Sequence, residues 1–190
     1  MLNTVNAVFN NPRARKIFLT LRVPLAIALV GLIAYYAQPR WMLAGFVVSL
    51  FGQAIQLWSF GSLVKNEQLT ARGPYVLVRN PMYLGRYFLI LGFVLVTGSV
   101  WALAGYSAFY YFYMANRVRR EEARLAQLLG APYAAYCARV DRFLPDFSKL
   151  GDPALRFLNF AVLRRNHGHW NFLATLIAWA ALYLYLRYLR

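Results

Sequence analysis

Long apolar runs separated by short basic segments dominate the hydrophobic pattern of this 190-residue chain. Most of the runs approach the roughly 20 residues that a helix needs to cross a bilayer. We interpret five of them as candidate spans. They lie at about Phe18–Ala37, at Trp41–Val64, twice within Met82–Ala115, and at about Trp170–Leu186. The pattern predicts an all-α, polytopic integral membrane protein with about five transmembrane helices and a cytoplasmic helical segment.

The third and fourth spans share the stretch Met82–Ala115, which is too long for one crossing at a rise of about 1.5 Å per residue. Thr97-Gly98-Ser99 is typical of a turn, so we expect a helical hairpin there. A separate helix is predicted over Arg117–Leu129, ended by the Gly-Ala-Pro sequence that follows. A short helix from Pro132 to about Val140 should come next, because proline is well tolerated at a first helical position.

Charge is distributed unevenly between the spans and sets their expected orientation. Segments 1–22, 65–86 and 116–168 hold 18 of the 21 Lys and Arg residues and all six acidic ones. By the positive-inside rule, the N-terminus, these segments and any active site among them should face the cytoplasm. The formal net charge is +15, but 61% of the residues are hydrophobic. Because a nucleic-acid reader would carry its basic residues along a soluble face, we expect no nucleic-acid partner.

The stretch after residue 150 combines apolar and basic residues. Asp152 can cap a helix that begins at Pro153 and contains ALRFLNFAVLRR. A helix rich in Leu, Phe and Arg is suited to lie at the membrane surface against anionic lipid headgroups. We therefore expect a single membrane domain over residues 1–190, in which residues 150–190 add an interfacial helix and a C-terminal transmembrane helix.

The first candidate functional segment is RGPYVLVRNPMYLG, residues Arg72–Gly85. Its Gly-Pro and Asn-Pro pairs predict two bends, and Pro81 is suited to the first turn of a helix. Free backbone N–H groups at that helix start, together with Arg79 and Arg86, would make an electropositive cavity at the membrane edge. The alternative is a stiff interfacial loop, with its arginines on lipid phosphates and Tyr83 in an aromatic belt.

The second candidate segment is RVRREEARL, residues Arg117–Leu125. Glu122 falls on the apolar stripe of this helix, where a carboxylate is costly to bury without a partner. Glu121 sits about 100° further round the helix, so the two acids can present acceptors to one pocket. The alternative is an ordinary ion pair between Arg117 and Glu121, four residues apart on a solvated face.

Together, RGPYVLVRNPMYLG and RREEARLAQLLGAPYAAYCARVDRFLP resemble the isoprenylcysteine carboxyl methyltransferase family and, more distantly, the phospholipid N-methyltransferases. The resemblance covers about residues 61–147, which we take as a methyltransferase-like cofactor-binding core. It implies an integral membrane methyltransferase that takes S-adenosylmethionine from the cytoplasm and a lipid-like or prenylated acceptor from the bilayer. Residues 150–190 lie outside the resemblance.

The resemblance also implies roles for individual residues. It gives Arg117 and Glu121 catalytic roles, with Arg117 orienting the acceptor or the cofactor. The implied cofactor contacts are Tyr75, Arg79, Asn80, Tyr83, Gly85, Glu121 and Glu122. The family usually has a histidine where this chain has Asn80, which keeps a donor and an acceptor but cannot titrate. Asp141 replaces a proline that often precedes the Arg-Phe-Leu-Pro ending.

Two other enzyme or binding functions compete with methyl transfer. Membrane sterol reductases resemble the same C-terminal pattern and would use NADPH. A non-enzymatic lipid-binding protein would keep the first segment for phosphate contacts alone. The absence of a plausible base near the motifs favours a carboxylate or another acceptor that needs no deprotonation.

Some further side chains have mainly structural interpretations. His167 and His169 are two possible metal ligands without a convincing third, so we expect no metal site. The aromatic residues Tyr110, Tyr111 and Tyr113 are interpreted as packing or as an interface belt.

Overall fold

The computed structural model describes residues 12–64 and 69–189, and this part of the chain is mostly α-helical, with no β-strand among the described residues. The α-helices are α2 (Pro12–Tyr36), α3 (Met42–Ser62), α4 (Pro81–Leu95), α5 (Val100–Leu129), α6 (Ala131–Arg139), α7 (Phe160–Arg165) and α8 (Gly168–Tyr188). Short 3₁₀ turns are η1 (Pro39–Trp41), η2 (Gly73–Val76), η3 (Phe147–Gly151) and η4 (Pro153–Arg156). The all-α prediction is confirmed for the described chain.

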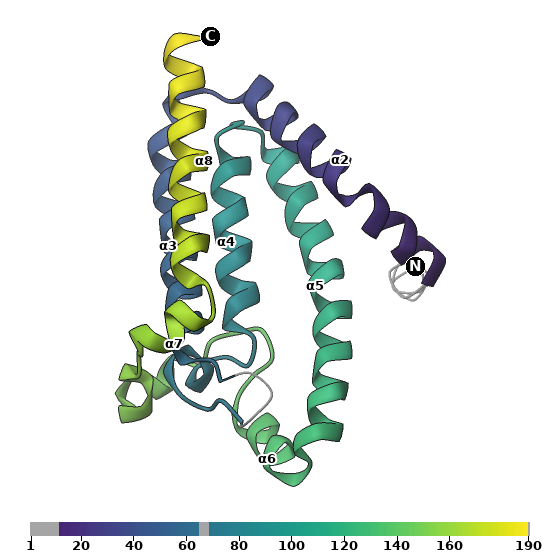
Figure 1. Cartoon of the computed structure of the whole chain (residues 1–190), viewed down its shortest axis with the longest axis vertical. Helices are drawn as coiled ribbons and strands as arrows, with labels where there is room; N and C mark the ends of the chain where they lie inside the picture. The colour runs from purple at the N-terminus through teal and green to yellow at the C-terminus, as the bar shows by residue number, and fades with distance from the viewer. Residues whose placement is uncertain (1–11, 65–68, 190) are drawn as a thin grey trace.

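Helices α3, α4 and α8 run side by side, α5 diverges from them toward α6, and α2 leans away from the bundle (Figure 1). The α3–α4 contact is close because glycines face backbone across it. A Cβ atom on Gly52 would lie 2.3 Å from the backbone nitrogen of Leu89, and one on Gly92 would lie 2.3 Å from the carbonyl oxygen of Gly45. Small residues allow two helices to approach this closely.

Helix α8 is attached to α3 by hydrogen bonds within the apolar part of the bundle. The side-chain amide of Gln53 donates to Asn171 Oδ1 at 3.0 Å, and Thr175 Oγ1 donates to Gln53 Oε1 at 2.9 Å. Gln53 is buried, so these bonds satisfy a polar group that would otherwise be costly at this depth. The C-terminal span predicted from sequence therefore packs as part of the bundle.

Two helical stretches among the described residues are long and apolar enough to cross a membrane by length and composition, Pro39–Ser62 and Gly168–Tyr188. The stretches Val23–Tyr36 and Pro81–Leu95 are apolar but shorter. The 15 residues of α4 extend about 22 Å, less than a hydrocarbon core of about 30 Å. Five spans therefore stay a prediction. The predicted cytoplasmic N-terminus lies outside the described residues.

Helix α5 differs from its prediction. The turn after α4 is confirmed, since α4 ends at Leu95 and α5 begins at Val100 with the Ser99 hydroxyl accepting from Ala102 N at 3.2 Å. The prediction that Arg117–Leu129 is helical is confirmed, but this stretch is the second part of α5, which continues for 30 residues without a break. No Gly or Pro interrupts the junction, and buried Asn116 donates within the helix to Phe112 O at 2.9 Å. The predicted end before Gly130 and the short helix α6 are confirmed.

The predicted interfacial helix after Asp152 is also corrected. Asp152 caps as expected by accepting from Ala154 N at 2.8 Å, but the 3₁₀ turn η4 ends at Arg156 and α7 begins only at Phe160. The intervening residues cannot continue the helix because α3 binds their backbone. Phe157 O accepts a hydrogen bond from the Trp58 indole at 3.1 Å, and Asn159 N donates to Gly61 O at 3.1 Å.

Parts of four helices come together at the end of the bundle opposite the α4–α5 turn (Figure 1). The C-terminal end of α3, the N-terminal end of α4, the second half of α5 and helix α6 meet there. Both segments singled out from the sequence lie at this end.

Candidate functional site

A cavity of about 340 Å³ lies at this end of the bundle, and both sequence motifs line it. Six of the predicted site residues are in its wall: Tyr75, Arg79, Asn80, Tyr83, Arg117 and Glu121. Apolar and aromatic residues of α5 and α6, including Leu125, Leu129 and Tyr133, complete it. The volume falls within the range of about 300–1,000 Å³ that is usual for small-molecule sites. Two segments about 40 residues apart thus form one site.

The first motif is held by backbone pairing with the chain that follows α6. Arg79 N donates to Asp141 O at 2.9 Å, and Asp146 N donates to Leu77 O at 2.9 Å. The Tyr136 hydroxyl donates to Tyr75 O at 2.8 Å. Burial is the main cause that raises the pKa of both phenols above its usual value. The two tyrosines therefore stay neutral and offer the site aromatic surface and donors instead of charge.

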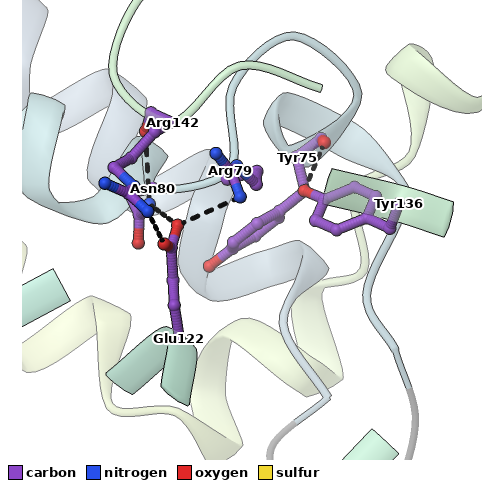
Figure 2. A network of polar contacts seen from close by, with 6 residues as sticks. All are labelled: Tyr75, Arg79, Asn80, Glu122, Tyr136 and Arg142. Atoms are coloured by element: carbon purple, nitrogen blue, oxygen red, sulfur yellow. Dashed lines mark hydrogen bonds and ion pairs between the residues drawn. The ribbon is translucent and has the colours of Figure 1, made fainter. Parts of the chain in front are cut away.

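Glu122 is the centre of a buried polar network (Figure 2). Its Oε2 lies 2.6 Å from Arg142 Nη2, and its Oε1 lies 3.4 Å from Arg79 Nη1. The Asn80 amide donates to Glu122 Oε1 at 3.5 Å and to Arg142 O at 3.2 Å. The prediction that Glu122 faces the protein is confirmed, since it is 8% exposed. Both its oxygens are occupied, and the residue does not line the cavity.

Glu121 and Arg117 are joined through Tyr83 at the rim of the cavity. Arg117 Nε donates to the Tyr83 hydroxyl at 2.8 Å, and that hydroxyl donates to Glu121 Oε2 at 2.8 Å. Both bonds are solvent-exposed. The structure does not have the direct Arg117–Glu121 ion pair of the alternative interpretation. Instead, hydrogen bonds through Tyr83 connect the two residues and link the two motifs. A charged donor and a charged acceptor remain at the cavity edge.

Gly85 is placed away from this cavity. It lies in the α3–α4 contact, where a Cβ atom would be 2.7 Å from Gly52 O and 2.8 Å from Gln56 Cγ. The close packing of α4 against α3 is therefore enough to explain why this position is a glycine. Among the residues expected to contact a cofactor, Gly85 and Glu122 are the two that the cavity does not include.

A second cavity of about 260 Å³ lies between α4 and α5. Its wall is mostly apolar and aromatic and includes Leu84, Met114 and Phe143, with a Tyr87–Ser107 hydroxyl pair 2.9 Å apart. Asn80 lines both cavities. Tyr110 and Tyr111, interpreted from sequence as packing residues, also line this second cavity.

Sequence reasoning missed Arg142, Tyr133 and Tyr136 as parts of the site. Arg142 lies within the stretch that carries the family resemblance, but it meets Glu122 only because the chain turns back after α6. No local periodicity signals that contact. Among the described residues no group of three or more possible metal ligands is found.

The first cavity has arginine donors and one carboxylate acceptor in its wall, so it suits a ligand that carries both an anionic group and an amine or hydroxyls. Arg79 lines the cavity, so its guanidinium can donate to an anionic group there. Glu121 can accept from an amine or from hydroxyls, and Tyr133 with the leucines of α5 offers a surface for a ring. These features define an all-helical protein with a polar ligand site at the edge of an apolar bundle.

Comparison with known proteins agrees with an all-helical protein of this kind. Residues 41–131 match the phospholipid methyltransferase family. Protein-S-isoprenylcysteine O-methyltransferase of Xenopus laevis is 26% identical in an alignment of 121 residues that covers 57% of this chain and 42% of that protein. The match therefore spans less than half the length of the relative. No solved structure matches the chain. The resemblance predicted from the two motifs is confirmed, and α3, α4 and α5 lie within the matched region.

Proposed function

We propose that this protein transfers a methyl group from S-adenosylmethionine to a lipid-like or prenylated acceptor at the cytoplasmic membrane face. The observation that carries the proposal is the meeting of both motifs around one cavity. That cavity shares Asn80 with a second, apolar one between α4 and α5. A polar cofactor site beside an apolar chamber is what transfer between a soluble donor and a lipid requires. We keep residues 61–147 as the cofactor-binding core.

The cofactor would be held by residues of both motifs. Arg79 would bind its carboxylate through the part of its guanidinium that lines the cavity, and Glu121 would accept from its amine or ribose hydroxyls. Tyr75, Asn80 and Tyr83 would line the remaining polar wall. In this proposal Glu122 and Gly85 act indirectly, since Glu122 fixes Arg79 and Gly85 fixes the packing of α4. Bound there, the cofactor supplies an activated methyl group on a sulfonium.

The acceptor would place its apolar part in the chamber between α4 and α5. Leu84, Met114 and Phe143 supply apolar surface, and the Tyr87–Ser107 pair satisfies its own polar atoms. The polar end of the acceptor would reach Arg117, which points to the cavity rim and also bonds the Tyr113 hydroxyl at 3.3 Å. The main work of these residues is to align the acceptor with the methyl group and to exclude water.

The charge of the site favours an anionic acceptor. Arg79, Arg86 and Arg117 line the first cavity, and Glu121 is the one acidic residue in its described wall. A carboxylate acceptor is already ionised and is attracted by Arg117, whereas an amine acceptor is repelled by it and must first lose a proton. We therefore propose a carboxylate or another anionic acceptor, carried by a membrane lipid or a lipidated small molecule.

The proposed orientation follows the positive-inside rule. The described basic residues of 69–86 and 116–168 would face the cytoplasm, together with the N-terminus and the active site. Exposed apolar and basic side chains share the stretch between α6 and α8: Leu150, Arg156, Leu158, Phe160, Arg164 and Arg165. Apolar side chains interleaved with arginines favour contact with anionic headgroups. Five membrane spans complete this arrangement.

Binding of S-adenosylmethionine to the detergent-purified protein, measured by calorimetry, tests the cofactor assignment. We expect Arg79→Ala and Glu121→Ala to weaken binding by roughly tenfold or more, since each loses a charged hydrogen bond. Arg119→Ala, on the exposed side of α5 and of the same charge, is the matched control and should bind normally. A parent protein that does not bind S-adenosylmethionine refutes the proposal. Heat protection by NADPH instead would favour a membrane reductase.

Transfer of labelled methyl to membrane fractions tests the acceptor. The label should enter an acidic lipid or lipidated fraction as a base-labile ester if the acceptor is a carboxylate. Base-stable label in an amine-containing lipid would refute the anionic-acceptor assignment. Ser107→Trp, which fills the chamber, should abolish transfer and leave cofactor binding intact. Binding without any transfer, together with unaltered activity in cells of Glu121→Ala, would support the non-enzymatic lipid-binding alternative.

A further inference from the structure

The end of α3 is capped by residues about 100 positions further along the chain. The last carbonyl groups of a helix lack partners within the helix and need others. The Asn166 side-chain amide donates to Phe60 O and to Leu63 O, each at 2.8 Å. Asn159 N donates to Gly61 O at 3.1 Å. Asn166 is 7% exposed, so water cannot readily replace its two bonds.

The same segment also contacts the start of the first motif. Phe157 O accepts from Ser62 Oγ at 3.2 Å, and the Arg72 guanidinium carbon lies 3.8 Å from the centre of the Phe157 ring. Gly73 has φ +58° and packs so closely that a Cβ would lie 2.1 Å from Ser62 Oγ and 3.1 Å from Phe157 O. Residues 157–166 thus contact both the end of α3 and the Gly-Pro turn.

Both of these contacted regions lead directly into the cavity. Leu63 and Val64 leave α3 and line it, and Tyr75 lines it two residues after Gly73. Leu63 O is itself one of the two acceptors of Asn166. A shift of residues 157–166 would therefore be transmitted to this wall through one or two residues.

We propose that residues 157–166, which lie outside the matched region 41–131, are a positioning element of the cofactor cavity, with Asn166 as its main positioning residue. This inference rests on the proposed function for its ligand. It concerns how the cavity wall is held and assigns no contact with substrate to Asn166. Residues outside the matched region would then be needed for full affinity for the cofactor.

The test compares Asn166→Asp, which keeps the size but removes the donor, with Thr175→Val. Thr175 is also buried and also ties α8 to α3, but it does so within the bundle, through Gln53. Amide hydrogen exchange of residues 69–76 is measured without ligand in detergent. We expect exchange roughly tenfold faster in Asn166→Asp and unchanged in Thr175→Val. Phe157→Leu, which removes the ring beneath Arg72, should show the same effect if Asn166→Asp does not fold.

Affinity for S-adenosylmethionine is the second measurement on the same variants. The dissociation constant should rise roughly tenfold in Asn166→Asp or Phe157→Leu and stay at the parent value in Thr175→Val. Unchanged exchange in both Asn166→Asp and Phe157→Leu overturns the inference, as does equal acceleration in Thr175→Val. If the parent does not bind the cofactor, the proposed function fails, while the exchange comparison still decides whether the segment holds this wall.

Discussion

The two neighbouring acids of α5 should contribute to different properties, and substituting each one separates them. Glu122 is buried and pairs with Arg142 and Arg79, whereas Glu121 lies exposed at the cavity rim. Replacing Glu122 with alanine leaves two arginines close together without their shared carboxylate. Replacing Glu121 leaves the Tyr83 hydroxyl free to bond water. We therefore expect a large loss of stability in the first variant and a small one in the second.

The size of the loss can be worked from the exposure of the partners. Removing one member of a buried ion pair costs about 3–5 kcal/mol. The Arg142 side chain is 41% exposed, while those of Arg79 and Glu122 are 14% and 10% exposed. Solvent screening therefore reduces the Arg142 contribution, and the lower end of the range applies. We expect about 3 kcal/mol for Glu122→Ala and about 1 kcal/mol for Arg142→Ala.

Thermal unfolding in detergent, followed by size-exclusion fluorescence, measures these losses. A chain of this size loses about 2–4 °C of midpoint per kcal/mol. Glu122→Ala should therefore unfold about 6–12 °C below the parent, and Glu121→Ala within about 3 °C of it. The order should reverse for S-adenosylmethionine affinity when each variant is measured well below its midpoint. A Glu122→Ala midpoint equal to that of Glu121→Ala would refute the assignment of separate roles.

Three further predictions concern packing, pH and the start of α5. Gly52→Ala should lower the unfolding midpoint by several degrees, because its Cβ would meet the backbone of α4 at 2.3 Å, whereas Gly105→Ala meets nothing within 4 Å and should not destabilise. Burial raises the pKa of Tyr75 and Tyr136 above 10.0. The stability that this shift contributes is present below about pH 10 and is lost as the pH rises further. In an alkaline titration, the absorbance of tyrosinate from these two residues should therefore appear together with unfolding. Tyrosinate at these residues in protein that is still folded would contradict this prediction. Ser99→Ala should lower the midpoint by a few degrees through loss of the α5 cap, about 1 kcal/mol, with Ser148→Ala as a control outside any α-helix.

Much of the helical layout could be predicted because its determinants are local. The Thr-Gly-Ser turn, the stop at Gly130 and the Asp152 cap all depend on residues within one turn of the feature. The family resemblance added which segments should meet. It named Arg79, Tyr83 and Glu121 together, and these do line one cavity. The apolar stripe through Glu122 correctly indicated burial, since helical periodicity reports which face points inward.

The errors arise where distant segments compete for the same backbone groups. The stretch after Asp152 has helical composition, yet α3 takes up Phe157 O and Asn159 N and splits it into two short pieces. Arg142 pairs with Glu122 across 20 residues of chain, through a turn whose direction no periodicity encodes. In α5, no side chain marks a boundary between the apolar and charged halves. The predicted boundary there reflected a change in composition, which does not end a helix by itself.

The continuity of α5 fixes the distance between the two cavities along its axis. Ser107, in the wall of the apolar chamber, and Arg117, at the cofactor cavity, are ten residues apart on one uninterrupted helix. They are therefore held about 15 Å apart along its axis. In the proposed function, the acceptor would have to span that length between its apolar part and the atom that is methylated. Selection among membrane lipids would then depend on where along the molecule the reactive group sits, more than on the identity of the group beyond it.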